Sequence, residues 1–175
     1  MMAPAEELAQ IGQTLVQAYT QIQHTRMRGL PIVNSALQVE AVGLRPWGGL
    51  CVGVLVTPWC MNLLALPMPG GRALPPVPTG TACTLDLPAG RYDLLAAHLP
   101  QIGHHLSGSL YSPMDEFASQ DEAVTAAYAA LGLLFDPTAA TPLQAVAESA
   151  SVLPNGAVDA SNVSRRSFLF PSSAG

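Results

Sequence analysis

An uncharged and almost entirely apolar run at residues 50–67 (LCVGVLVTPWCMNLLALP) constrains the fold of this chain more than any other stretch. A run of this length is long enough to cross a lipid bilayer as a helix. Pro58 in its middle and the polar side chain of Asn62 favour a different interpretation. Proline lacks the N–H that a helix or a sheet interior requires, so it fits a corner between two strands. We therefore predict two buried strands, at 51–56 and 61–66, joined by a tight turn around Pro58.

The composition of the 175-residue chain limits the classes of protein to which it can belong. With 49% apolar and 11% charged residues, the chain can bury a substantial core in one domain. A net charge of −5 with seven basic residues argues against a nucleic-acid-binding surface, which requires a basic excess. The N-terminus lacks the basic residues of a secretory signal, and three cysteines without paired spacing indicate a reducing compartment. We expect a soluble cytoplasmic protein that inserts into no membrane.

Two helices are predicted, at residues 5–28 and 119–135. The first has apolar side chains at intervals of three and four residues, and Gly29 follows it as a stop signal. Ser119 is a suitable N-cap for the second helix, and Glu122 completes the pattern of a capping box. The buried face of this second helix is predicted to consist of Val124, Ala127, Tyr128, Leu131, Leu134 and Phe135.

Alternating apolar and polar residues predict further strands outside the central pair, at residues 37–44, 81–87, 91–99 and 106–111. Residues 45–49 (RPWGG) are interpreted as a hairpin connection, which makes 37–66 a β-meander. Glu40 in its first strand is either a functional carboxylate or, as is more common, lies on the solvent face or pairs locally. Residues 67–80 contain five prolines and three glycines and are predicted to form an extended, poorly packed loop.

These elements combine into an α+β fold. It consists of the N-terminal helix, an antiparallel sheet of about five strands, and the second helix covering one face of that sheet. The domain is predicted to span residues 1–137. Residues 138–175 are rich in alanine, threonine, serine and proline and are predicted to be a disordered, flexible tail, which ends in the motif SRRSFL at 164–169.

The sequence offers no persuasive sign of catalysis or of a bound metal or cofactor. It lacks a G-x-S-x-G elbow, and its glycine pairs are not arranged as in phosphate-binding loops. Cys51, Cys60 and Cys83 are too dispersed to suggest a metal site. His104 and His105 are adjacent, so on a strand they would point to opposite faces. We expect a protein without catalytic residues, metal or cofactor.

Bulky apolar residues gather instead at two predicted corners of the sheet. Trp59 and Met61 flank the central turn, and Tyr111, Met114 and Phe117 follow the last strand. Each of them, taken singly, is more often a core residue than a surface one. Exposed side chains of these types are effective anchors at protein interfaces, however, and bulky residues on loops are often functional. The cluster therefore favours a protein-binding module.

Three segments of the chain resemble the HybE/HupJ/HoxT family of [NiFe]-hydrogenase assembly chaperones. They are LPIVNSALQVEAVG at 30–43, VTPWCMNLLALP at 56–67 and SLYSPMDEF at 109–117. The closing SRRSFL resembles an arginine-pair ending common in that family. The chain departs from the family pattern at Cys60, where an aromatic residue is expected, and at Gly108, where a cysteine is often found.

The resemblance implies a non-catalytic cytoplasmic chaperone that attends hydrogenase subunits before their export by the twin-arginine route. Its partners would be the precursor of the small, iron–sulfur subunit, the large subunit, and other maturation proteins such as a rubredoxin. The HoxT-like branch is tied to maturation in air, and no C-x-x-C of a fused rubredoxin domain is present. The proposed roles are orientation of the client by Asn62 and Glu116 and apolar anchoring by Trp59, Met61, Tyr111 and Met114. The expected client surface comprises Trp59, Met61, Asn62, Tyr111, Pro113, Met114, Glu116 and Phe117.

Two further interpretations remain open. The motif SRRSFL, with Arg165 and Arg166, resembles a twin-arginine signal, yet no hydrophobic segment follows it. It is either a mimic of the client's signal or a basic segment that docks on an acidic partner, unless the match is a coincidence. The alternative function is a redox or metal-cluster accessory protein that acts on the hydrogenase iron–sulfur subunit through cysteine and histidine.

Overall fold

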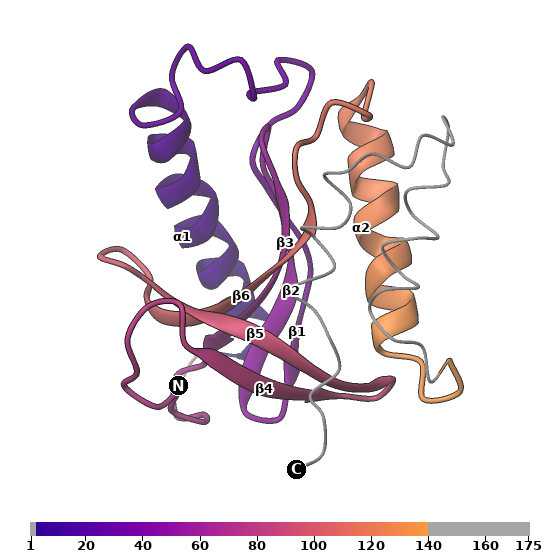
Figure 1. The fold of residues 1–175 in the computed structure, drawn as a ribbon. Helices are drawn as coiled ribbons and strands as arrows, with labels where there is room; N and C mark the ends of the chain where they lie inside the picture. The colour runs from indigo at the N-terminus through magenta and orange to yellow at the C-terminus, as the bar shows by residue number, and fades with distance from the viewer. Residues whose placement is uncertain (1–2, 140–175) are drawn as a thin grey trace.

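Two helices and six strands make up residues 3–139, the part of the chain that this computed structural model describes (Figure 1). In chain order they are α1 (Pro4–His24), β1 (Glu40–Trp47), β2 (Leu50–Val56), β3 (Met61–Pro67), β4 (Ala82–Leu87), β5 (Gly90–Leu99), β6 (Gly103–Tyr111) and α2 (Gln120–Leu134). All six strands belong to one antiparallel sheet in the order β1-β2-β3-β6-β5-β4. The α+β prediction is confirmed, with six strands in place of about five.

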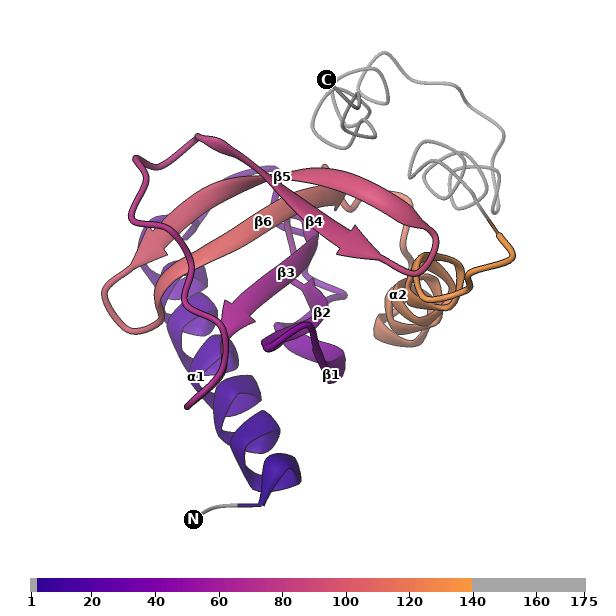
Figure 2. The same cartoon turned by 90° about the horizontal axis from the view of Figure 1, so that it is seen from below.

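The apolar run at 50–67 forms the two strands β2 and β3, as predicted, and they lie inside the sheet. Every residue of β2 is buried because the sheet carries a hydrophobic core on each face. On one face, Val52, Val54 and Val56 pack with residues of α2. On the other face, Leu55 and side chains of β3 pack with α1. The two helices accordingly lie on opposite sides of the sheet (Figures 1 and 2).

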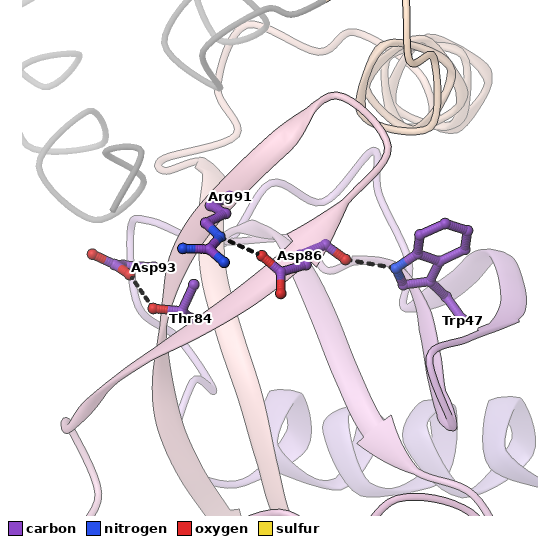
Figure 3. A network of polar contacts seen from close by, with 5 residues as sticks. All are labelled: Trp47, Thr84, Asp86, Arg91 and Asp93. Atoms are coloured by element: carbon purple, nitrogen blue, oxygen red, sulfur yellow. Dashed lines mark hydrogen bonds and ion pairs between the residues drawn. The ribbon is translucent and has the colours of Figure 1, made fainter. Parts of the chain in front are cut away.

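The sheet is strongly curved, and its two edge strands meet at one corner. The indole Nε1 of Trp47, the last residue of β1, donates a hydrogen bond of 2.6 Å to the backbone oxygen of Asp86 in β4 (Figure 3). Strands β1 and β4 are the opposite edges of the sheet, so this bond requires the sheet to curl around its core. The C-terminal end of α2 is attached to the same region, because the N–H of Ala89 bonds to the oxygen of Leu134 at 3.1 Å.

Several element boundaries differ from the sequence-based predictions. Helix α1 ends at His24, not at residue 28, because the N–H of Met27 turns back to the oxygen of Ile22 at 3.0 Å. Residues 45–47 continue β1 and are not a hairpin connection, so the turn contains only Gly48 and Gly49. Both glycines have a positive φ, which ordinary side chains adopt only with strain. Proline in β1 is tolerated because an edge strand need not donate every N–H to a neighbour.

The cap of α2 is as predicted, and so is most of its buried face, since Ala127, Leu131 and Leu134 are buried and Val124 and Phe135 pack partly buried against the core. Ser119 Oγ accepts from the N–H of Glu122 at 3.3 Å, while the Glu122 carboxylate accepts from the N–H of Ala118 at 2.8 Å. Tyr128, predicted to be buried, is 55% exposed. The residues that face the core are Ala123, Ala126, Ala127, Ala130, Leu131 and Leu134. The four alanines among them let α2 approach the sheet more closely than a tyrosine would allow.

Two remaining expectations concern packing and the membrane. The loop between β3 and β4 has no regular structure and is largely exposed, which agrees with the prediction of a poorly packed loop, although its side chains Leu74 and Val77 pack partly buried against the core. Within residues 3–139, no helix has the length and apolar character needed to span a bilayer. The boundary predicted at residue 137 stays a prediction, and most of the proposed tail lies outside the described residues.

Candidate functional site

Asn34 joins the three segments that carry the family resemblance. Its side-chain Nδ2 donates to the backbone oxygens of Met114 at 3.0 Å and Phe117 at 2.8 Å, which lie 80 and 83 residues further along the chain. Its backbone N–H donates to the oxygen of Pro58 at 2.8 Å. The Asn34 Oδ1 accepts from the N–H of Ala36, so both the nitrogen and the oxygen of the side-chain amide form hydrogen bonds. Loops distant in sequence thus meet at one end of the sheet, which we call the motif end (residues 30–36, 57–60 and 112–117).

The turn from β2 to β3 is closed by Thr57. Its backbone N–H donates to the oxygen of Cys60 at 2.8 Å, and its hydroxyl also lies 2.8 Å from that oxygen. The same hydroxyl accepts from the N–H groups of Cys60 and Trp59, at 2.9 and 3.3 Å. Thr57 is itself buried, so the turn is fixed from the inside. This turn holds Trp59 partly exposed at the motif end.

Half of the residues expected to form the client surface belong to the core. Met61, Tyr111 and Met114 are fully buried, and Phe117 is nearly so. The rings of Tyr111 and Phe117 pack edge to face with centroids 5.0 Å apart. The sequence-based description of Met61, Tyr111 and Met114 as exposed apolar anchors is therefore wrong for this fold. These side chains instead pack in the core next to the motif end, and the backbone oxygen of Met114 accepts from Asn34.

The other four predicted residues, Trp59, Asn62, Pro113 and Glu116, are partly buried, so some of each side chain is accessible. The larger exposed apolar side chains at this end were missed. Leu30 is 44% exposed and Ile32 is 38% exposed, on the loop that Asn34 ties to Pro58. The signal available in the sequence was a run of apolar residues directly after a helix stop, because bulky apolar residues on a loop are often functional. Two further side chains with large exposure, Trp47 and Tyr128, lie elsewhere.

The thiols of Cys60, at the motif end, and of Cys51, near the opposite end of β2, are protonated at neutral pH. Burial raises the pKa of Cys60 to about 11, although hydrogen bonds from the side chains of Thr57 and Asn62 act in the opposite direction. Burial, together with the nearby Cys60, raises the pKa of Tyr19 to about 12. Burial also raises the pKa of Cys51 to about 11. A protonated thiol is a poor nucleophile and a poor metal ligand.

The remaining candidate ligands are dispersed as well. The exposed His104 and the buried His105 point to opposite faces of β6, as predicted. Over residues 3–139, histidine, cysteine and carboxylate side chains nowhere gather in a group of three that could hold a metal ion. Glu40 accepts a hydrogen bond from Gln120 Nε2 at 3.2 Å, which agrees with a local pairing role.

Comparison with known proteins gives the family. Residues 10–171 match the model of the family described as [NiFe]-hydrogenase assembly, chaperone, HybE. This chain belongs to that family. The chain is 42% identical over 126 residues to the hydrogenase expression/formation protein HupJ of Bradyrhizobium diazoefficiens, covering 72% of each protein. It is 39% identical over 132 residues to the hydrogenase expression/formation protein HoxT of Azotobacter vinelandii, covering 75% of this chain and 84% of the relative.

The fold also matches a solved member of this family. The solution structure of HybE from Escherichia coli superposes with a TM-score of 0.58 at 19% sequence identity, covering 86% of each chain. The resemblance to the HybE/HupJ/HoxT family is thereby confirmed, and the protein is an assembly chaperone of [NiFe] hydrogenase. The family match extends to residue 171, beyond the described part of the chain. The motif SRRSFL, with Arg165 and Arg166, lies outside the described residues.

Proposed function

We propose that this HybE-family chaperone binds a precursor subunit of a [NiFe] hydrogenase through its motif end and keeps that subunit available for assembly. The observation that carries the proposal is the junction at Asn34, which joins the three family-like segments at one end of the sheet. The client is the small, iron–sulfur subunit with its twin-arginine signal, the large subunit, or both in turn. Binding precedes export, takes place in the cytoplasm and involves no catalytic step.

The chemistry of the motif end supports this assignment. Leu30, Ile32 and Trp59 present apolar surface on loops whose backbone is held by internal hydrogen bonds. Preorganised apolar side chains lose little conformational freedom on binding, so they give more affinity than mobile ones. A precursor subunit that has not yet met its partner exposes apolar surface of the kind these side chains would cover.

A redox or cluster-handling role is less well supported. It would require a thiolate or a group of ligands facing the client. Burial keeps the thiols of Cys51 and Cys60 protonated, with pKa values of about 11. The iron–sulfur cluster of a client would therefore meet an apolar surface at the motif end rather than thiolate ligands. Protection of maturation under oxygen would then come from covering client surface.

A pull-down from cells that make the hydrogenase tests the client surface. The double variant Leu30→Ser/Ile32→Ser removes exposed apolar groups that contribute little to the core, so the fold should persist. Truncation of an interface anchor typically costs on the order of 1–2 kcal/mol, so we expect affinity for a precursor subunit to fall at least about tenfold. Tyr128→Ser is the matched control, because Tyr128 is an exposed aromatic residue on α2, away from the motif end.

The result that contradicts the proposal is equal recovery of the subunit by wild type and by the double variant. Recovery of no hydrogenase subunit by the wild type would contradict it as well. Deletion of residues 164–175 in the same experiment examines the proposal that Arg165 and Arg166 mimic the client's twin-arginine signal. Unchanged affinity for a signal peptide after that deletion would remove the mimicry idea.

A further inference from the structure

A second candidate binding surface lies at the opposite end of β2 from the motif end. It is a pocket of about 400 Å³ between the β1–β2 turn, β4 and the loop after β3. We call it the Trp47 pocket, and it is lined by Trp47, Gly48, Leu50, Arg72, Leu85 and Asp86. Its volume is in the range that accommodates one large side chain of a bound peptide. The family resemblance and the motif end account for none of these residues.

Trp47 is exposed and yet firmly held. It is 36% exposed, although its Nε1 is bonded to the oxygen of Asp86 at 2.6 Å (Figure 3). Its ring packs edge to face on Phe135 with centroids 5.5 Å apart, which adds a second constraint. A tryptophan fixed in one orientation loses little entropy when a partner packs on it, and such residues dominate interface energetics.

The charges around this pocket are unusual for an acidic chain. Arg72 is exposed, and its backbone N–H donates to the oxygen of Gly49 at 2.8 Å, which fixes it beside the turn. The guanidinium of Arg45 lies over the ring of Phe135, 4.6 Å from its centroid. Neither arginine forms an ion pair with an acidic side chain in the described part of the chain.

The acidic residue in the pocket is already paired. The carboxylate of Asp86 accepts from Arg91 Nε at 2.9 Å, and both side chains point away from the indole in Figure 3. The pocket therefore combines apolar side chains with Arg72, which forms no ion pair with an acidic side chain within residues 3–139. This combination complements a negatively charged group beside an apolar one.

We propose that the Trp47 pocket binds a segment of a partner protein in which a large apolar side chain is flanked by carboxylates. The apolar side chain packs on Trp47, Leu50 and Leu85, and a carboxylate pairs with Arg72. A chaperone with a second, charge-selective site would hold an acidic segment at one end while the motif end remains available for another surface.

Fluorescence of a single tryptophan tests this proposal directly. The full-length variant Trp59→Phe leaves Trp47 as the only tryptophan of the chain. The probe is a short synthetic peptide with two glutamates flanking a leucine, and its counterpart carries glutamines in their place. We expect the acidic peptide to shift the Trp47 emission in a saturable and salt-sensitive way, and the glutamine peptide to bind about tenfold more weakly.

Variants of two exposed arginines then locate the binding site. Arg72→Gln should lower the affinity for the acidic peptide about tenfold and bring it to the level of the glutamine peptide. Arg28→Gln is the matched control, because Arg28 is an exposed arginine on the loop after α1. It should leave the affinity unchanged. Leu30→Ser/Ile32→Ser should also leave peptide binding unchanged, which separates this pocket from the motif end.

Several outcomes would overturn the proposal. They are an unchanged emission spectrum, equal affinity for the two peptides, or an equal loss in the Arg28→Gln control. A change in Trp47 emission with protein concentration would show instead that a second copy of the chain fills the pocket. A change on removal of residues 140–175, without any peptide, would assign the pocket to the chain's own C-terminal segment.

Discussion

At the scale of single residues, His105 is the titratable side chain whose burial has the clearest consequence. It is fully buried in β6, with Nδ1 2.9 Å from the oxygen of Gly103, and its Nε2 has no hydrogen-bond partner among residues 3–139. Burial lowers the pKa of His105, the hydrogen bond to Gly103 raises it, and His98 and His104 lower it further. The net effect is a lowered pKa, so the imidazole is neutral in the folded protein.

A stability measurement against pH follows from this neutral histidine. The unfolded chain takes up a proton near the ordinary histidine pKa of about 6.5, while the folded chain does so only at lower pH. The contribution of His105 is therefore fully present above about pH 6.5 and is lost as the pH falls below that value. We expect the urea midpoint to decrease between about pH 7.5 and about pH 5.5.

Two variants separate His105 from the other histidines. His105→Gln should flatten this part of the profile, whereas His104→Gln, a substitution on the exposed face of β6, should leave it in place. A profile that is unchanged by His105→Gln would show that other groups dominate the pH dependence.

At the scale of elements, the motif end depends on one asparagine that holds three segments together. Asn34 forms a local turn, in which its Oδ1 accepts from the N–H of Ala36. The same side chain also donates to Met114 and Phe117, and no local pattern indicates such distant acceptors. The existence and type of the elements followed from local signals, whereas the junction between them did not.

Substitution of Asn34 should destabilise the fold and loosen the motif end. Asn34→Ala removes both donated bonds, and although the Met114 oxygen keeps the bond from the N–H of Phe117, the Phe117 oxygen loses the donor from Asn34, so we expect a cost of about 1–3 kcal/mol. Asn34→Asp keeps an oxygen for the N–H of Ala36 but still loses both donors and places a negative charge near two carbonyls. Urea unfolding should therefore show both variants to be less stable than wild type. Equal stability of Asn34→Asp and wild type would show that the two donated bonds contribute little.

At the scale of the whole molecule, the curved sheet is open on one side and α2 fills the opening. Residues of α2 join the same core as β2, β3 and the strands near the other edge. Helix α2 also lies against β1 at its irregular point, where the register shifts between Val42 and Arg45. Gly43 lies inside this bulge with φ +64°, and a Cβ there would lie 2.5 Å from Leu131 Cδ1.

Gly43→Ala should therefore displace α2 from the sheet. The substitution combines backbone strain with a steric clash against Leu131, and we expect a loss of about 2–4 kcal/mol in the free energy of unfolding. Gly48→Ala is the matched control, because Gly48 has φ +57° but open space around its Cβ position. It should cost only the strain, about 1 kcal/mol. Equal losses in the two variants would show that the close approach of α2 does not matter.

The sequence by itself determined the elements and the family of this protein. The apolar run interrupted by Pro58 specified β2 and β3, and Ser119 specified the start of α2, because these signals act between residues close in the chain. The segments around Asn34, Pro58 and Met114 were specific enough to indicate the HybE family.

Only the tertiary structure decided which side chains reach the surface. Met61, Tyr111 and Met114 are buried while Leu30 and Ile32 are exposed, and local pattern does not distinguish these cases. The bond from Trp47 to Asp86 likewise arises only when the curved sheet brings its two edges together. Burial depends on what packs against a residue from distant parts of the chain, and that information is absent from any short stretch of sequence.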